Sequence, residues 1–310
     1  MKAVRYHRHG DSEVLVHEEA ARPVPGAGQV LVKVAGTSFN PVDAAIRAGY
    51  LQQVFAVALP HVPGIDVAGT ILELGRGVTD WNVGDEVVAF LPMNAAGAAA
   101  EYVLAPEKVL AAAPKTVELA DAAALPAVGL TAWQALFEHA DVKAGQTILI
   151  NGAGGAVGGY AVQLSHQAGA KVTATASARS AERVRGYGAD RIIDYTVTPV
   201  TEAAGEQFDV VLNLVTTSKQ ETADLVGLVR EGGVLVSTTT PASEDATRGV
   251  RTVRVFARSD ADQLTTLVAR VDAGELRIDV ADRRPFADLA AVHREAAAGQ
   301  LAGKTVLLAG

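Results

Sequence analysis

A glycine-rich segment between a strand-like run and a helix-like run constrains the fold of this chain more than any other feature. Five of the eight residues from Gly152 to Gly159 are glycine. Glycine weakens regular elements but permits unusual backbone dihedrals and close approach of other groups. A strand, a glycine turn, a helix and a second strand form the β-α-β unit that binds dinucleotides: glycine leaves room for the pyrophosphate, and the helix N-terminus offers N–H groups. The segment therefore predicts a dinucleotide-binding domain.

The context of the segment gives this prediction its weight. The spacing is Gly152-x-x-Gly155-x-x-Gly158, which departs from the strict G-x-G-x-x-G pattern, and a glycine motif alone is weak. Six short β-rich runs separated by helix-like segments surround it, namely TILIN, KVTATA, RIIDY, DVVLNLV, GVLVST and TVRVFA. This alternation is typical of a doubly wound parallel sheet. We expect the cofactor to be bound by Gly152, Gly154, Gly155, Ala156, Val157 and Gly158.

The end of the second strand indicates which dinucleotide is bound. An NAD site usually has Asp or Glu there for the ribose hydroxyls, and that acid would repel a 2′-phosphate. Here the strand runs into TATASARSAER, with Ser177 and Arg179 directly after it and Arg183 one helical turn on. These side chains can hydrogen-bond and charge-pair a phosphate. We therefore predict NADPH over NADH, with Arg179 as a merely solvated arginine as the alternative.

The segments outside the β-α-β units suggest a second domain. The first part of the chain has short strand-like runs closed by turns (QVLVKVAGTSFN, VAGTILELG, DEVVAFLP and AEYVLAP), with one short helix at 40–50. Strands at this spacing suggest a barrel or sandwich. We expect this catalytic domain to cover 1–120 and the nucleotide-binding domain to cover 121–257. Residues 258–310 should complete the first domain.

The segments beyond that boundary, and the one that links the two domains, carry their own predictions. A helix should cover roughly 120–139. After residue 257 we expect a helix over 261–273, a strand at ELRIDV, a helix near 288–298 and a closing strand KTVLLA. The closing strand is apolar on both faces, so it should return to the first domain.

Charge and composition exclude several classes of function. The net charge is −8 and no cluster of basic residues is present, which argues against nucleic-acid or acidic-membrane partners. The sequence has no cysteine, which removes thiolate nucleophiles, disulfides and cysteine metal sites. Its most apolar run carries Pro and Gly and is too short to span a bilayer. A cytoplasmic protein is the default expectation.

With both parts in view, the sequence resembles the medium-chain dehydrogenase/reductase superfamily and, within it, the zinc-free quinone oxidoreductases of the zeta-crystallin-like branch. The matching segments are SFNPVDAAIRAG, PHVPGIDVAGTI, VGDEVVAF, AALPAVGLTAWQAL, GAGGAVGGYAVQLSHQAGAKV, GADRIIDY and GKTVLLAG. The resemblance implies an α/β chain with a GroES-like β-barrel catalytic domain, a Rossmann domain and a cleft between them.

The resemblance also implies that no catalytic metal is present. In zinc-dependent relatives a Cys precedes the Asp of the first segment, and Gly-His-Glu carries a second ligand. Here the first segment reads TSFNPVD and the second reads Gly64-Ile65-Asp66. Because Ile65 has no lone pair to offer, we expect no zinc.

The family assigns roles to matched positions. Asn40 and Thr131 should lie near the nicotinamide, which Val215, Thr238, Val255 and Phe256 should frame. Ser177, Arg179 and Tyr195 should surround the adenosine phosphate. Two departures affect the substrate pocket: NLVTTS replaces an Asp-x-Val-Gly-Gly segment of many relatives, and Ala45 stands where some have Tyr.

The predicted function is zinc-independent hydride transfer from NADPH to quinones or other conjugated carbonyl compounds, with hydrogen bonds from Asn40, Tyr50 or water. Tyr50 could equally be a surface residue, and Asp43 should cap its helix rather than act as an acid. Two alternatives stay open: an enoyl or enone reductase of the same fold, and a non-catalytic NADPH-binding protein. We also expect a homodimer, because the edge strand RTVRVFA needs a partner.

Overall fold

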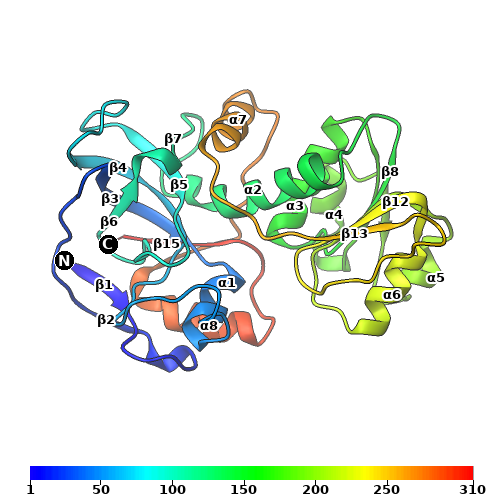
Figure 1. Cartoon of the computed structure of the whole chain (residues 1–310), viewed down its shortest axis with the longest axis horizontal. Helices are drawn as coiled ribbons and strands as arrows, with labels where there is room; N and C mark the ends of the chain where they lie inside the picture. Colours follow the sequence, from blue (N-terminus) through cyan, green and yellow to red (C-terminus); the bar gives the residue numbers. More distant parts are fainter. Residues whose placement is uncertain (310) are drawn as a thin grey trace. The chain divides into compact units, whose positions relative to one another are not determined.

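The computed structural model describes residues 1–309 and divides into two compact units. The first unit consists of Met1–Ala127 together with the chain from Ser259 onward, and the second consists of Val128–Arg258. Both chain ends, blue and red in Figure 1, belong to the first unit. Within residues 1–309, no helix combines the length and apolar character that crossing a membrane requires.

The second unit is built on a six-stranded sheet in which every neighbouring pair is parallel. The strand order is β10-β9-β8-β11-β12-β13, so the chain starts in the middle, builds outward to one edge, and then returns to build the other half. This is the doubly wound order expected from the sequence. The strands are β8 (Thr147–Asn151), β9 (Lys171–Thr175), β10 (Arg191–Ile193), β11 (Phe208–Asn213), β12 (Val229–Ser237) and β13 (Arg251–Arg254).

Helices cover both faces of this sheet, because right-handed crossovers that run in opposite directions place their helices on opposite sides. In Figure 1, α3 and α4 lie on one side of the strands and α6 on the other. The helices are α3 (Ala156–Gln167), α4 (Ala178–Gly186), α5 (Val200–Ala204) and α6 (Lys219–Gly227). An apolar core under β8, β11 and β12 includes Leu149, Phe208, Val211 and Leu235.

The helix predicted for 120–139 is instead three short pieces. A 3-10 helix covers Asp121–Ala124, α2 covers Pro126–Trp133, and a π-helical segment covers Gln134–His139. The break has a simple cause, because Pro126 has no N–H to donate into a continuing helix and fits only at the first position of a new one.

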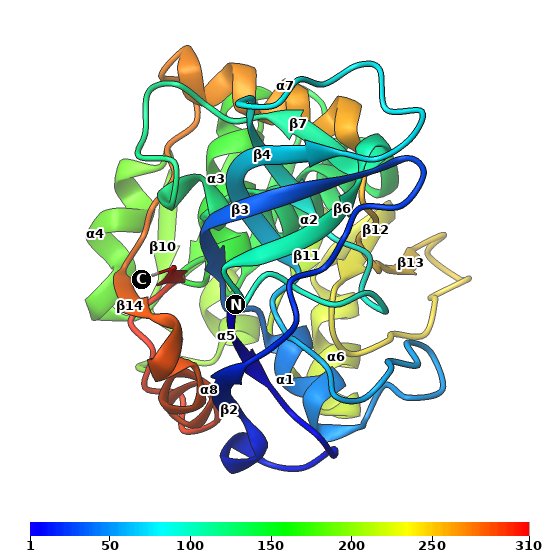
Figure 2. The ribbon, with the colours of Figure 1, turned by 90° about the vertical axis from the view of Figure 1, so that its left-hand side faces the viewer.

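The first unit is built around the long strand β3, which pairs with three other strands. A seven-stranded sheet has the order β14-β15-β3-β4-β5-β7, and β6 also pairs with β3. Figure 2 shows β3 with β4 and β6 beside it. The closing strand β15 lies against β3 in this unit. The strands are β1 (Lys2–Arg5), β2 (Val16–Glu19), β3 (Gln29–Ser38), β4 (Asp66–Leu74), β5 (Glu86–Phe90), β6 (Tyr102–Pro106), β7 (Leu110–Ala112), β14 (Asp282–Pro285) and β15 (Thr305–Leu308).

The helices of the first unit are α1 (Pro41–Ala48), α7 (Ala261–Asp272) and α8 (Leu289–Ala297), and besides the 3-10 helix at Asp121–Ala124 there are 3-10 turns at Ser12–Val14, Glu107–Val109 and Phe286–Asp288. The strand predicted at ELRIDV is wrong. The N–H groups of Glu275 and Leu276 both donate to the carbonyl of Arg270, so this segment closes the end of α7. The strand in this part of the chain is β14, which lies a few residues further on and pairs with β15.

Candidate active site

The junction between β3 and α1 holds Asn40 in a fixed, buried place. Pro41 opens α1 at its first position, and the Asp43 carboxylate accepts the Asn40 backbone N–H at 3.0 Å, which caps the helix as expected. The preceding Phe39 N–H donates to the carbonyl of Thr305 in β15. The side chain of Asn40 is only 4% exposed.

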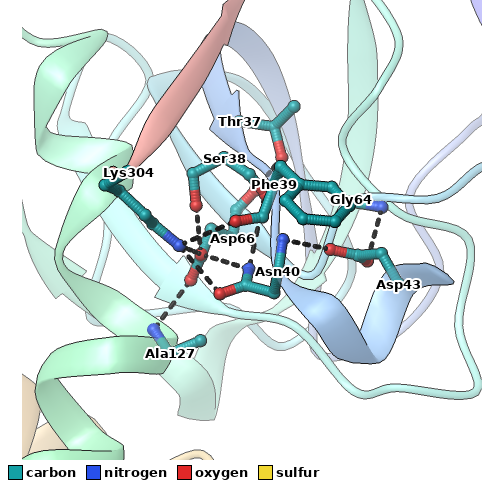
Figure 3. Close-up of polar contacts among 9 residues, drawn as sticks. All are labelled: Thr37, Ser38, Phe39, Asn40, Asp43, Gly64, Asp66, Ala127 and Lys304. Carbon is teal, nitrogen blue, oxygen red and sulfur yellow. Dashed lines mark hydrogen bonds and ion pairs between the residues drawn. The ribbon is translucent and has the colours of Figure 1, made fainter. Parts of the chain in front are cut away.

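Four side chains, Ser38, Asn40, Asp66 and Lys304, form what we call the Asn40 cluster (Figure 3). The Asn40 Oδ1 accepts from Lys304 Nζ at 2.8 Å. The Asn40 Nδ2 donates to Asp66 Oδ2 at 2.8 Å and to the Ser38 carbonyl at 3.3 Å. Both amide hydrogens are therefore used within the protein, so only the amide oxygen can contact a further group.

Asp66 and Lys304 are a buried ion pair with every polar contact satisfied. Asp66 Oδ2 accepts from Ser38 Oγ, Asn40 Nδ2 and Lys304 Nζ, and its Oδ1 accepts from the Ala127 N–H at 2.7 Å. Lys304 Nζ donates to the Phe39 carbonyl, Asn40 Oδ1 and Asp66 Oδ2. Three acceptors require the three hydrogens of an ammonium group. Burial lowers the pKa of Lys304, and attraction to Asp66 opposes that shift.

Asp43 lies beside this cluster and lines a small cavity. Its two carboxylate oxygens accept backbone N–H groups, Oδ2 from Asn40 and Oδ1 from Gly64. Burial, and then repulsion from Asp66, raise the pKa of Asp43 to about 7. The cavity of about 10 Å³ has room for about one water. Its polar wall is Tyr6, Asp43 and His61, and the Tyr6 hydroxyl has no hydrogen-bond partner among the described residues.

The donor set at this place does not fit a zinc ion. Ile65 has an apolar side chain that is 6% exposed, and the neighbouring Asp66 is committed to four hydrogen-bond donors. The sequence supplies no cysteine. Among residues 1–309, no group of three or more histidine, aspartate or glutamate side chains has an arrangement that could hold a metal ion.

Tyr50 follows the left-handed Gly49 that ends α1. Its side chain is 82% exposed, in contrast to the buried Asn40. Both residues belong to the first unit.

In the second unit, the predicted cofactor residues gather at one edge of the parallel sheet. Because all six strands point the same way, the segments that follow their carboxyl ends share that edge. After the strands come Gly152, Gly154 and Gly155 (β8), Ser177 and Arg179 (β9), Tyr195 (β10), Val215 (β11), Thr238 (β12), and Val255 with Phe256 (β13). Ala156, Val157 and Gly158 open α3 at the same edge, whereas Thr131 lies on α2.

A row of neutral side chains, which we call the edge ladder, ties these strand ends together. Thr175 Oγ1 donates to Asn151 Oδ1, and Asn151 Nδ2 donates to Asn213 Oδ1, both at 3.0 Å. Asn213 Nδ2 in turn donates to Ser237 Oγ and to the Val215 carbonyl. The four residues come from β9, β8, β11 and β12. The ladder therefore fixes the loops that follow four neighbouring strands.

The glycines in this turn are required by close contacts. Gly152 has a φ of +96°, and a Cβ there would lie 2.7 Å from Val215 Cγ1. A Cβ on Gly158 would lie 2.5 Å from both Ala153 Cα and the Gly152 carbonyl oxygen. Gly155 is exposed at the N-terminus of α3, whose first-turn N–H groups have no partner within the helix. Such a turn fits a dinucleotide pyrophosphate.

Two polar side chains at the end of β9, Ser177 and Arg179, are the residues predicted to bind a 2′-phosphate. Ser177 is the N-cap of α4 but makes no capping bond with its side chain, and Arg179 is exposed. Within the described chain, no hydrogen bond or ion pair engages the Arg179 guanidinium. Arg183 is different, because its Nη2 donates to the Gly154 carbonyl at 2.9 Å and so holds the glycine turn.

The other predicted residues differ in exposure. Tyr195 and Phe256 are 54% and 59% exposed, and the Arg254 guanidinium lies 4.6 Å from the centre of the Phe256 ring. Val255 is buried, and its N–H donates to the Ser237 carbonyl. Thr238 donates its N–H to the Asn213 carbonyl.

Sequence reasoning missed Asp66 as a hydrogen-bonding centre, Lys304, and the two ladder asparagines Asn151 and Asn213. Asp66 is the first residue of β4 and Lys304 directly precedes β15, and both strands begin with buried residues. That pattern was a usable signal, since a charged residue is rarely fully buried unless it is paired.

Comparisons with known proteins agree with this architecture. Residues 26–115 match the alcohol dehydrogenase GroES-like domain, and residues 187–307 match a family described as zinc-binding dehydrogenase. The "Quinone-oxidoreductase homolog, chloroplastic" of Spinacia oleracea is 39% identical over 69% of this chain and 68% of that relative. The "NADPH-dependent alkenal/one oxidoreductase, chloroplastic" of Arabidopsis thaliana is 37% identical over 92% of this chain and 73% of that relative.

Among solved structures, the quinone oxidoreductase from Coxiella burnetii superposes with a TM-score of 0.90 at 28% identity, covering 100% of this chain and 99% of that one.

Proposed function

The chain belongs to the medium-chain dehydrogenase/reductase superfamily, in its zinc-free quinone oxidoreductase branch, and from that premise we propose that it uses NADPH to reduce quinones and other conjugated carbonyl compounds. It is an NAD(P)-dependent oxidoreductase. The preference for NADPH and the identity of the acceptor are the proposed parts.

One observation carries the choice of acceptor. Where zinc-dependent members of the superfamily have a metal ligand, this chain has buried Ile65, and the carboxylate of the next residue is fully engaged in the Asn40 cluster. Among its described residues, the first unit therefore has no ligand set for a Lewis-acidic metal ion that could polarise an isolated ketone. A quinone or enone needs less polarisation, because the negative charge that develops as hydride adds is delocalised over the conjugated system and its oxygen.

The chain's residues then act by holding and orienting the reactants. The glycine turn and the start of α3 hold the pyrophosphate, and Ser177, Arg179 and Tyr195 surround the adenosine phosphate. Asn40, Thr131, Val215, Thr238, Val255 and Phe256 orient the nicotinamide, and the exposed Tyr50 hydroxyl donates a hydrogen bond to the acceptor. NADPH, when bound, supplies the hydride. Correct orientation accounts for most of the rate enhancement in this proposal.

A turnover screen tests the proposal. NADPH oxidation is followed by absorbance with quinones, enones, enoyl thioesters and simple ketones. We expect turnover with the conjugated compounds and none with the ketones. Tight NADPH binding without turnover on any conjugated acceptor would contradict the proposal and favour a non-catalytic NADPH-binding protein.

An enone reductase is a second candidate. It is favoured by the 37% identity, over 92% of this chain, to a relative named for alkenal and alkenone reduction. The same screen separates the two, because an enone reductase has the higher kcat/KM for alkenals and alkenones than for quinones.

We also propose a homodimer. β13 is the last strand of the six-stranded sheet, so one side of its backbone is left without a strand partner among the described residues. Pairing two such edges around a two-fold axis satisfies these groups. The edge residues Arg251 and Arg254 are the argument for a monomer, since edge charges prevent pairing. Light scattering at micromolar concentration decides, and a mass near the 32.0 kDa of one chain contradicts the dimer.

A further inference from the structure

We propose that Lys304 and Asp66 are positioning residues that hold the Asn40 carboxamide in one orientation, so that Asn40 offers bound reactants an acceptor and never a donor. This inference rests on the proposed function for the identity of those reactants. The orientation itself is a property of the protein alone.

The contacts of Asn40 permit only one orientation of its amide. Lys304 can only donate hydrogen bonds, so the atom 2.8 Å from its Nζ must be the amide oxygen. The ionised Asp66 can only accept, so the atom 2.8 Å from its Oδ2 must be the amide nitrogen. Turning the amide over would face N–H groups toward an ammonium and an oxygen toward a carboxylate.

Neither member of the pair can itself reach a reactant. All three hydrogens of Lys304 are donated inside the first unit, and both carboxylate oxygens of Asp66 already accept. The side chains of Lys304 and Asp66 are 4% and 0% exposed. Their effect on the reaction must therefore pass through Asn40, and this distinguishes a positioning role from a catalytic one.

The orientation has a chemical consequence. With both amide hydrogens donated to Asp66 and Ser38, Asn40 can offer a reactant only its amide oxygen. It can accept from a hydroxyl or amide N–H of a bound reactant. It cannot donate to the carbonyl oxygen of the acceptor molecule, so that hydrogen bond comes from another group.

The test combines NMR spectroscopy with kinetics on the full-length protein. The Asn40 side-chain NH₂ pair is assigned by its loss in Asn40→Ala. In the unmutated protein we expect it to exchange slowly with solvent, and in Lys304→Met we expect fast exchange or a shifted pair. Lys33→Met, which removes an exposed lysine from β3, is the matched control and should leave the pair unchanged.

The kinetic part is a double-mutant cycle. Lys304→Met and Asn40→Ala should each lower kcat by roughly 10- to 100-fold, as misplacement of a reactant does. Because Lys304 acts through Asn40, adding Lys304→Met to Asn40→Ala should cause no further loss. A structural role alone would give additive losses and would overturn the proposal, as would an unchanged NH₂ pair in Lys304→Met.

Two further arms keep the test decisive. If Lys304→Met does not fold, the variant Lys304→Met with Asp66→Asn removes both charges together, and the same changes in the NH₂ pair and kcat are expected. If the unmutated protein turns over no acceptor, the proposed function fails. The NMR comparison still supports or overturns the positioning role, because it needs no substrate.

Discussion

The Asn40 cluster of the first unit and the edge ladder of the second are both buried polar groups at strand ends, but one contains charged side chains and the other only neutral ones. The cluster is charged, and its Asp66 carboxylate and Lys304 ammonium have every hydrogen bond satisfied. The ladder is neutral, with one hydroxyl or amide contributed by each of four strands. The cluster holds one side chain in one orientation, whereas the ladder aligns a row of loops.

This difference agrees with the role proposed for each region. A single reactive position is fixed best by strong, directional contacts on every atom, and buried charges supply them at a high desolvation cost. A phosphate-binding edge needs uncommitted backbone N–H groups, and nearby buried charges would compete for them. Neutral links hold the loops and leave those donors free.

The largest expected effect is in the charged region. Asp66→Ala leaves the Lys304 ammonium buried without a counter-charge, which should lower the free energy of unfolding by about 3–5 kcal/mol. Urea unfolding measures this loss. Asp80→Ala, which removes an exposed carboxylate of the same unit, should stay within about 0.5 kcal/mol of the unmutated protein. Equal losses in the two variants would mean that the cluster carries no special stability.

The next effect concerns binding at the neutral edge. Arg179→Ala should raise the Kd for NADPH about tenfold or more and leave the Kd for NADH unchanged, because a charge-assisted phosphate contact contributes about 1.5–3 kcal/mol. Fluorescence titration with both cofactors measures it. Arg185→Ala, at an exposed position later in α4, is the control and should change neither Kd. Equal affinity of the unmutated protein for the two cofactors would contradict the assignment.

Removing a ladder member should have a smaller effect than removing Asp66. Asn151→Ala leaves the Thr175 hydroxyl and the Asn213 carbonyl oxygen without this partner, and an unsatisfied buried polar group costs about 1–3 kcal/mol. Thermal and urea unfolding measure the loss, with the exposed Gln220→Ala as control. A loss as large as that of Asp66→Ala would remove the contrast between the two regions.

The smallest effect is a pH dependence of the free energy of unfolding that arises from a histidine of the first unit. Burial lowers the pKa of His61 from 6.5 to about 4. Its neutral form therefore contributes stability that is complete above about pH 6.5 and is lost as the pH falls toward 4. His61→Phe should remove this contribution, so its unfolding free energy should fall less than that of the unmutated protein between pH 7 and pH 5.

Two neighbours set the background for that experiment. Repulsion from His9 adds to the effect of burial in lowering the pKa of His61, so His61→Phe and the unmutated protein are compared in the same buffers. Asp43 contributes to stability in the opposite direction. Because its pKa is raised to about 7, its contribution is present near pH 4 and is lost as the pH rises through 7. The edge ladder has no titratable group, so Asn151→Ala should keep the unmutated pH profile. An identical profile for His61→Phe would rule out the His61 contribution.

Local sequence patterns were sufficient for most of the fold. The alternation of apolar runs and helices predicted the doubly wound parallel sheet of the second unit, and the helix expected at 40–50 with Asp43 as its cap corresponds to α1. The failures came from contacts that local patterns do not record. ELRIDV has a strand-like composition, yet its first N–H groups are taken by the end of α7. Pro126 interrupts the helix over 120–139 that the apolar composition predicted as one continuous element.

The candidate site divides in the same way. Glycine, serine and arginine after strand ends are visible in the sequence, because their chemistry depends on position relative to a strand. A charged residue at the start of an apolar strand indicates that Asp66 and Lys304 are paired, but the sequence does not show with which residues, because Asn40 and Lys304 are 264 positions apart and meet only when β15 pairs with β3. Burial, which turns an ordinary lysine into an orienting group, is a property of the folded molecule.

The pairing of β15 with β3 also has a consequence for how the protein is made. A ribosome releases the chain from the N-terminus, so β3, α1 and β4 emerge before the second unit, and β15 emerges only after it. The second unit can therefore begin to fold during translation, before Lys304 has been synthesised and can pair with Asp66. A chain that ends between residues 258 and 304 therefore contains the whole second unit but lacks Lys304, and its Asn40 cluster is incomplete.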